Sequence, residues 1–157
     1  MKITELISQH IIEIQEGDNW TDVNIKDTLA DVDYKEATTE TAASRNTIAA
    51  LVHHLSFYND VVRQRLSGNI PVIGESNGFD VPVIKNDDDW AKLKAHNVES
   101  AGELAAAVRE SPEEKIFELT VTGASTHYKM LHGIVEHAHY HLGQIVLIKN
   151  LIRSANL

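Results

Sequence analysis

Apolar residues recur every three to four positions in four separate segments, and this spacing constrains the fold of the chain more than any other feature. It is typical of amphipathic α-helices, which bury one stripe of side chains. The segments are 1–17, 46–66, 98–109 and a longest one from Ser125 or Thr126 to about Arg153. Because no convincing run of strands accompanies them, we expect an all-α fold, a four-helix bundle with long connecting loops.

The helices are expected to be joined by two long connections. Residues 18–45 are rich in Asp, Thr and Glu and favour at most a short helix at 24–29, while Asn46 is a good N-cap for the helix that follows. Residues 69–88 contain two prolines and two glycines, which predicts a loop crossing one end of the bundle. Further on, we predict a helical turn at 90–96 and an extended segment at 117–121, with Trp20 and Trp90 as anchors for the connections.

Composition excludes several kinds of function. The 157 residues, 43% of them hydrophobic, fit a single domain over 1–157. The chain has no cysteine, so a metal site must use nitrogen and oxygen ligands. A net charge of −9 argues against nucleic acid as the main partner. No signal-peptide pattern and no stretch of ~18 apolar residues is evident, so we expect no membrane partner and a cytoplasmic location.

Two of the nine histidines fall on the apolar face of the last predicted helix. At ~100° per residue, His141 lies about 40° from His137, and the apolar residues of this helix lie between roughly 20° and 80°. His139 falls near ~200°, beside His132, on another face. The spacing of four residues stacks His137 and His141 one turn apart, so that their ring nitrogens can converge on one ion.

A pair of inward-facing imidazoles needs partners for its polar nitrogens, because an unsatisfied buried polar group costs on the order of 1–3 kcal/mol. Mutual hydrogen bonding within the core would be one explanation. A metal ion is the explanation we favour, since each neutral ring gives one lone pair to the ion and donates its other N–H to a neighbouring acceptor.

A third ligand is expected from the helix at 46–66. The same angular reasoning puts His54 at the edge of the apolar arc and His53 on the surface. Asn59 and Gln144 are candidates for contacts around the metal or substrate, but a solvated polar face is the simpler explanation for both. The remaining histidines, His10, His96, His127 and His132, are interpreted as ordinary residues.

Three neutral histidines with an open position are typical of a catalytic metal site, because structural zinc sites usually have a fourth protein ligand. We expect a divalent transition metal, Zn²⁺ or Ni²⁺ first and Fe²⁺ as the third candidate, since imidazole suits all three. Such an ion acidifies a bound water and can bind a thiol as thiolate.

The residues around these histidines resemble the DinB/YfiT-like superfamily of metal-dependent enzymes. The strongest similarity is at 131–145 (LHGIVEHAHYHLGQI), the second is LVHHL at 51–55 followed by LSG at 66–68, and the resemblance covers the chain from residue 46 onward. It implies an up-down-down-up bundle whose metal is held by one histidine of the second long helix and an HxxxH pair of the last. Carried over, these are His54, His137 and His141.

The resemblance also suggests an activity. The family includes thiol-dependent S-transferases and isomerases, which implies a hydrolase or transferase acting on a small-molecule substrate such as a low-molecular-weight thiol. It further implies pairing of two chains as a homodimer. The alternative is a non-catalytic, metal-binding or stress-related structural module, in which any metal is structural.

Two other enzyme classes are disfavoured. Glu136 and His139 match the ExxH pattern of ferritin-like di-iron proteins, but such sites need a second ExxH helix and two further inward glutamates, which the sequence does not show. A serine hydrolase is disfavoured because no nucleophile-elbow motif accompanies the serines.

Overall fold

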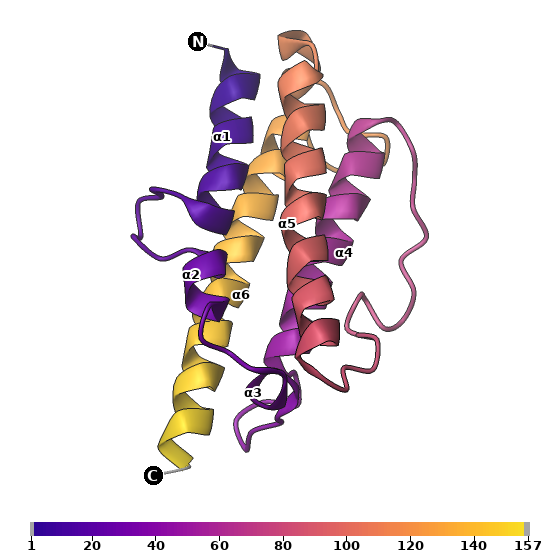
Figure 1. Cartoon of the computed structure of the whole chain (residues 1–157). Helices are drawn as coiled ribbons and strands as arrows, with labels where there is room; N and C mark the ends of the chain where they lie inside the picture. Colours follow the sequence, from indigo (N-terminus) through magenta and orange to yellow (C-terminus); the bar gives the residue numbers. More distant parts are fainter. Residues whose placement is uncertain (1, 156–157) are drawn as a thin grey trace.

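The computed structural model describes residues 2–155 and shows four long helices that pack side by side, with shorter helices in the connections (Figure 1). The described residues contain no strand and only two isolated β-bridges. The elements are α1 (Ile3–Glu16), α2 (Ile25–Leu29), α3 (Tyr34–Thr38), α4 (Ile48–Leu66), α5 (Asp87–Glu110), the 3-10 helix η1 (Glu113–Phe117) and α6 (His127–Ala155). The expected all-α bundle is confirmed.

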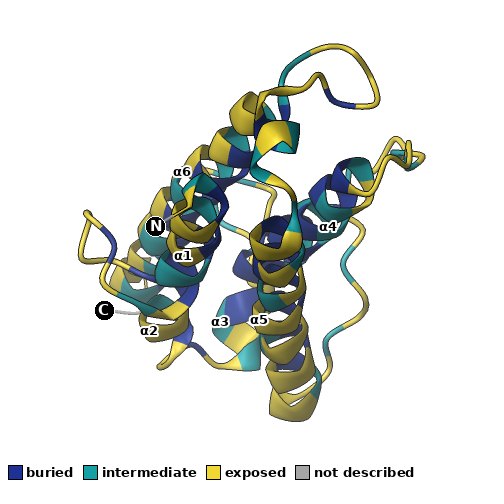
Figure 2. Cartoon of the chain, turned by 90° about the horizontal axis from the view of Figure 1, so that it is seen from above, coloured by how far each residue is buried: buried dark blue, intermediate teal, exposed yellow. Residues whose placement is uncertain are grey.

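The long helices have the expected up-down-down-up order. α4 and α5 run in one direction, while α1 and α6 run in the other (Figure 1). α5 packs against α1 and α4, and α6 packs against the same two helices. Figure 2 shows this arrangement from above, with the buried residues facing inward. Each long helix therefore buries one stripe against two neighbours, as the apolar spacing predicts.

The loop between α4 and α5 corrects one prediction. It does not cross one end of the bundle but runs along its side, from the end of α4 back to the level where α4 began (Figure 1). The reason is topological, because two consecutive helices that run in parallel need a connection as long as the helices themselves. This return path lays residues 77–79 beside α4, where they contact His53, His54 and Tyr58.

The third predicted helix is longer than expected. α5 is continuous from Asp87, so 90–96 is part of it and the last residues of the predicted loop form its first turn. The Asn86 side chain accepts a hydrogen bond from Asp89 N at 2.9 Å and caps the helix. The inward face includes the buried polar residues Asn97 and Ser100, which interrupt the apolar pattern on which the prediction rested.

The first helix buries a different face near its start. Thr4 and Ser8 are buried, whereas Leu6 is 53% exposed and Ile7 is partly buried. Small side chains allow α1 to pack closely against α5, and they displace the predicted apolar stripe outward. Ile11 and Ile14 are buried as predicted, and Gln15 is buried in addition.

The helix ends and connections differ from the predictions in several details. Thr47, rather than Asn46, caps α4, because its hydroxyl accepts from Ala50 N at 3.1 Å. The short helix predicted at 24–29 is α2, and α3 is an additional helix. The expected extended segment at 117–121 is reduced to a single bridge between Leu119 and Thr126.

The two tryptophans behave differently. Trp90 is buried, and its indole N–H donates to the carbonyl oxygen of Val32 at 2.8 Å, so it anchors the first connection as predicted. Trp20 is 98% exposed, so the prediction that it is an anchor is wrong. Within residues 2–155, no helix combines the length and the apolar character required for crossing a membrane.

Candidate metal centre

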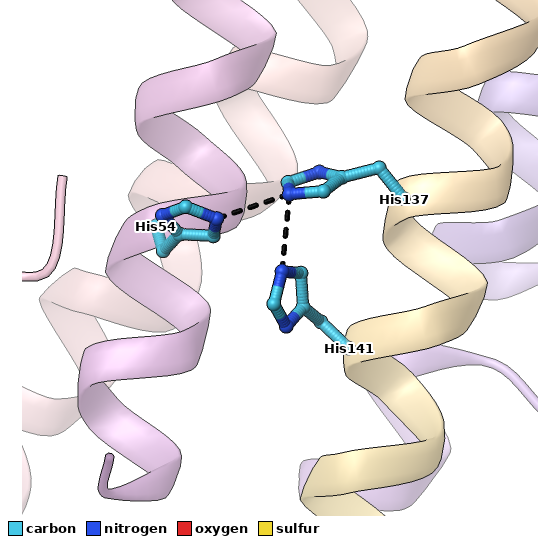
Figure 3. A group of neighbouring side chains, drawn as sticks. All are labelled: His54, His137 and His141. Carbon is cyan, nitrogen blue, oxygen red and sulfur yellow. Dashed lines mark hydrogen bonds between the residues drawn. The ribbon is translucent and has the colours of Figure 1, made fainter. Parts of the chain in front are cut away.

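Three histidines from two helices meet at the centre of the bundle (Figure 3). The Nε2 atom of His137 lies 3.0 Å from Nε2 of His54 and 3.0 Å from Nε2 of His141. One ring nitrogen of each residue lies within 4.8 Å of the others. The structure thus brings together the three residues that helical spacing selected.

The hydrogen bonds of two rings determine where their lone pairs point. His54 Nδ1–H donates to the carbonyl oxygen of Asn77 at 2.8 Å, and His141 Nδ1–H donates to Oε1 of Gln144 at 2.7 Å. Because a carbonyl oxygen can only accept, the proton of each neutral ring resides on Nδ1. The Nε2 lone pairs of His54 and His141 therefore both face His137.

The third ring lacks a comparable partner. His137 Nδ1 is buried and has no hydrogen-bond partner among residues 2–155. If His137 carries its proton on Nε2, it can satisfy one of the two facing lone pairs but not both. The cluster therefore leaves at least one nitrogen lone pair without a donor, a buried deficit that costs on the order of 1–3 kcal/mol.

Burial keeps the three rings neutral. It lowers the pKa of His54 and His141 and, together with repulsion from its two neighbours, lowers the pKa of His137 to about 4. The hydrogen bonds to Asn77 and Gln144 partly offset this lowering of the pKa for His54 and His141. No carboxylate is among the causes of the three pKa shifts. At neutral pH the site presents lone pairs rather than positive charge.

A tight turn in the loop forms one wall of the site. Asn77 and Gly78 both have positive φ, 52° and 76°, and Phe79 N donates to the carbonyl oxygen of Ser76 at 2.9 Å. An Asn-Gly pair is the residue combination that such left-handed turns favour. The turn directs the carbonyl oxygen of Asn77 to His54 and the carbonyl oxygen of Gly78 to His53.

Aromatic rings complete this wall. The ring of Phe79 stacks on His54 at a centroid distance of 4.0 Å, and the ring of Tyr58 lies 4.9 Å from His54 and 5.0 Å from His137. The hydroxyl of Tyr58 donates to Oδ1 of Asn77 at 2.6 Å. Both rings therefore pack against His54, and Tyr58 also contacts His137.

A cleft opens beside this wall, and Tyr58 and Asn77 belong to its lining. It has a volume of about 420 Å³ and is lined mainly by residues of α4 and α6, including His54 and His137. His141 is not part of its lining, so a small molecule in the cleft would approach the cluster past His54 and His137.

The other histidines lie outside the cluster. His139 bonds to the carbonyl oxygen of its own helix at Val135, and the exposed His132 pairs with Glu136 at 3.3 Å. Glu136 thus faces solvent, which agrees with the rejection of a di-iron site. His53, which was predicted to lie on the surface, is partly buried, and its Nδ1 bonds to the carbonyl oxygen of Gly78 at 2.8 Å. The loop covers this face of α4, and helical spacing alone cannot reveal such a cover.

Two predicted polar contacts have different outcomes. Gln144 contacts the cluster through His141, so the candidate contact is present and the simpler explanation of a solvated polar face is wrong for this residue. Asn59 does not, because its amide donates to Ser100 Oγ at 3.1 Å in a buried network between α4 and α5. His127 is also less ordinary than expected, since it is buried at the start of α6.

Sequence reasoning missed Asn77 and Phe79, which belong to the loop rather than to a helix. The Asn-Gly dipeptide was the available signal, because it marks a turn. The local sequence does not indicate which helix the turn packs against.

The fold and the site together define an all-helical bundle in which three neutral imidazoles converge in an arrangement compatible with a metal site. The sequence-family model of the DinB superfamily matches residues 18–145. This match begins earlier in the chain than the resemblance noted in the sequence, which covers the chain from residue 46 onward. The chain belongs to the DinB superfamily. No curated protein and no solved structure matches it.

Proposed function

We propose that His54, His137 and His141 bind one divalent transition-metal ion, Zn²⁺ or Ni²⁺ first and Fe²⁺ as the third candidate. The observation that supports this most strongly is the direction of the lone pairs. Two Nδ1–H groups are tied to oxygen acceptors, which is how metal-binding histidines are usually oriented. A cation among the three Nε2 atoms would satisfy the lone pairs that the protein leaves without donors.

The spacing of the nitrogens fits such an ion. Zinc–nitrogen bonds of about 2.0–2.1 Å place two ligand nitrogens about 3.3 Å apart in a tetrahedron. The two Nε2 separations of 3.0 Å are close to this value, and small rotations of the rings would adjust the third. Three protein donors are fewer than a structural zinc site normally uses, and the neighbouring cleft offers space for a further ligand.

We further propose that the protein is a metal-dependent enzyme of the hydrolase or thiol S-transferase type. The metal, when bound, would lower the pKa of a water or thiol and polarise an electrophilic substrate. The protein groups supply orientation and shielding. Gln144 and the Asn77 carbonyl hold two rings in position, and Phe79 covers the ring of His54 on one face.

The first experiment is metal analysis of protein purified without a metal-affinity column. We expect about one ion per chain in the wild type and in His132→Ala, which removes an exposed histidine of the same helix. His137→Ala and His141→Ala should lose the ion, with circular dichroism confirming that both remain helical. Equal metal content in all four proteins would contradict the metal site.

The second experiment separates an enzyme from a non-catalytic module. The metal-loaded protein is assayed for hydrolysis and for transfer of small thiols to electrophilic substrates. Activity that disappears in His141→Ala supports the enzyme. A metal that raises thermal stability without any turnover would favour the structural alternative. Pairing into a homodimer and a cytoplasmic location stay predictions.

A further inference from the structure

The cleft beside the histidines has a distinct chemical character. Val62 of α4 and Met130 and Ile134 of α6 give it apolar walls. None of the residues that line it is a carboxylate, and Arg65 is the lining residue with a permanent charge. In a chain with a net charge of −9, a cleft with a positive group and no negative one is unlike the general surface.

Arg65 has no partner of opposite charge within residues 2–155. Its Nε atom is buried and makes no hydrogen bond, and no carboxylate lies within ion-pair distance of the guanidinium. The Nε atom of Arg63, two residues earlier, is also buried without a hydrogen bond, but Arg63 has charge partners, because its Nη2 lies 3.2 Å from both Asp60 and Glu103. A basic residue in the last turn of α4 is favourable for the helix dipole, but that effect does not require the side chain to line the cleft.

The position of Arg65 suits the far end of an elongated ligand. Arg65 follows His54 by eleven positions, which corresponds to about 16 Å between their Cα atoms along the helix. Side chains of a helix lean toward its N-terminus, so the guanidinium is brought back toward the histidines. A short apolar chain could then span the remaining distance along the walls of the cleft.

We propose that Arg65 is a specificity-determining residue that binds the carboxylate of a small substrate. The apolar walls hold the body of this molecule, and its reactive end lies at His54 and His137. The guanidinium fork matches a carboxylate in geometry and charge, and a ligand carboxylate would satisfy its buried N–H. This inference names a substrate class for the proposed enzyme and rests on that proposal.

The test compares two thiols of equal length, 6-mercaptohexanoate and 6-mercaptohexan-1-ol, which differ in the end group that would reach Arg65. Binding to the Co²⁺-loaded protein is followed by the visible absorption of the cobalt site. We expect the carboxylate to bind about tenfold more tightly in the wild type and in Arg63→Gln, a matched control in the same turn. Arg65→Gln should remove this preference without weakening the alcohol, and Arg65→Lys should keep part of it.

A second arm does not depend on the metal. Hexanoate is added to metal-free protein labelled with ¹⁵N, and the amide signals are followed by NMR. Signals around Arg65 and Gly133 should shift in the wild type and stay in place in Arg65→Gln. If the protein binds no cobalt, the proposed function fails while this arm still decides the role of Arg65. Equal affinities for the two thiols, or a carboxylate preference that survives in Arg65→Gln, would overturn the inference.

Discussion

Two polar clusters of this protein differ in how completely their members satisfy one another. At the far end of α6, Arg153 binds Glu36 through two N–H groups and Asp31 through a third, and Lys149 also pairs with Asp31. These opposite charges hold the first connection against α6. The three central histidines have no such complement, because their nitrogens face one another without enough donors.

From this difference we assign the charged cluster to the fold and propose the histidine cluster as a ligand site. The charged cluster is partly exposed and balanced in charge, and the hydrogen bonds from Arg153 lower the pKa of Asp31 and Glu36. The histidine cluster is largely buried, and at least one of its nitrogen lone pairs has no hydrogen-bond donor. A protein keeps such an arrangement at a site of function more readily than elsewhere, since it lowers stability in the absence of the ligand.

The largest expected effect is stabilisation of the fold by the proposed metal ion. Zinc added to metal-free protein at a thousandfold excess over its Kd should stabilise the fold by about 4 kcal/mol. For a chain of this size, that corresponds to a rise of roughly 10 °C in Tm. Calorimetry should show the rise in the wild type and in His132→Ala and no rise in His141→Ala. An equal rise in His141→Ala would mean that zinc binds elsewhere.

A smaller effect is expected when the acceptor behind one ring is removed. Gln144→Leu leaves His141 Nδ1 without its oxygen partner, so the ring loses its orientation. Loss of such a contact typically weakens metal affinity about 10- to 100-fold. Gln144→Glu, which keeps an acceptor, is the control. Competition with a chromophoric chelator measures both variants, and an unchanged affinity in Gln144→Leu would show that the contact is dispensable.

The loop wall can be tested at Gly78. A Cβ atom there would lie 2.6 Å from ring atoms of Phe57, and the φ of +76° is unfavourable for any side chain. We expect Gly78→Ala to lower the free energy of unfolding by about 1–2 kcal/mol and to weaken metal binding, because the Asn77 carbonyl would shift.

Gly74→Ala is the matched control in the same loop. A Cβ there would meet nothing closer than 3.9 Å, and its backbone lies outside the left-handed region. Chemical denaturation of both variants in the metal-free and metal-loaded states separates the two effects. Equal metal affinity in Gly78→Ala and Gly74→Ala would remove the turn from the account of the site.

The smallest expected effect at pH values near neutrality is a difference between the two clusters in how their contribution to stability depends on pH. Burial lowers the pKa of His137 to about 4, so the unfolded chain binds more protons than the folded chain between about pH 6.5 and 4. The metal-free protein should therefore lose stability as the pH falls through this window, by at most about 1.4 kcal/mol per pH unit for each proton.

The charged cluster should respond in a different range. The pKa of Asp31 and Glu36 is lowered by Arg153, so their contribution is retained above about pH 4 and lost as the pH falls further. Urea denaturation should show that His137→Gln flattens the profile above pH 4, whereas Arg153→Met alters it below. The same profile in both variants would contradict this division.

Helical spacing predicted the parts of the site that depend on a single helix. The angle between His137 and His141, and the choice of His54 over His53, follow from 100° per residue and from the apolar residues around them. The all-α bundle follows from the same periodicity, because amphipathic helices must bury their stripes against one another.

The parts that were missed depend on contacts between distant segments. The loop residues Asn77 and Phe79 reach the site because α4 and α5 run in parallel, and local sequence does not contain that information. The continuity of α5 was missed because a polar residue, Asn97, occupies a core position, where its Nδ2 donates to Ser56 Oγ on α4 at 3.2 Å. Thr4 and Ser8 are also polar residues in buried positions, and they misled the prediction for α1.

The most direct test of the central claim is X-ray absorption spectroscopy at the metal edge of the protein as purified. Three imidazole nitrogens should appear at about 2.0–2.1 Å, with the outer-shell scattering that histidine rings produce. His141→Ala should lose one of the three if it retains the ion. A first shell with oxygen alone, or with fewer than two imidazoles in the wild type, would contradict the account.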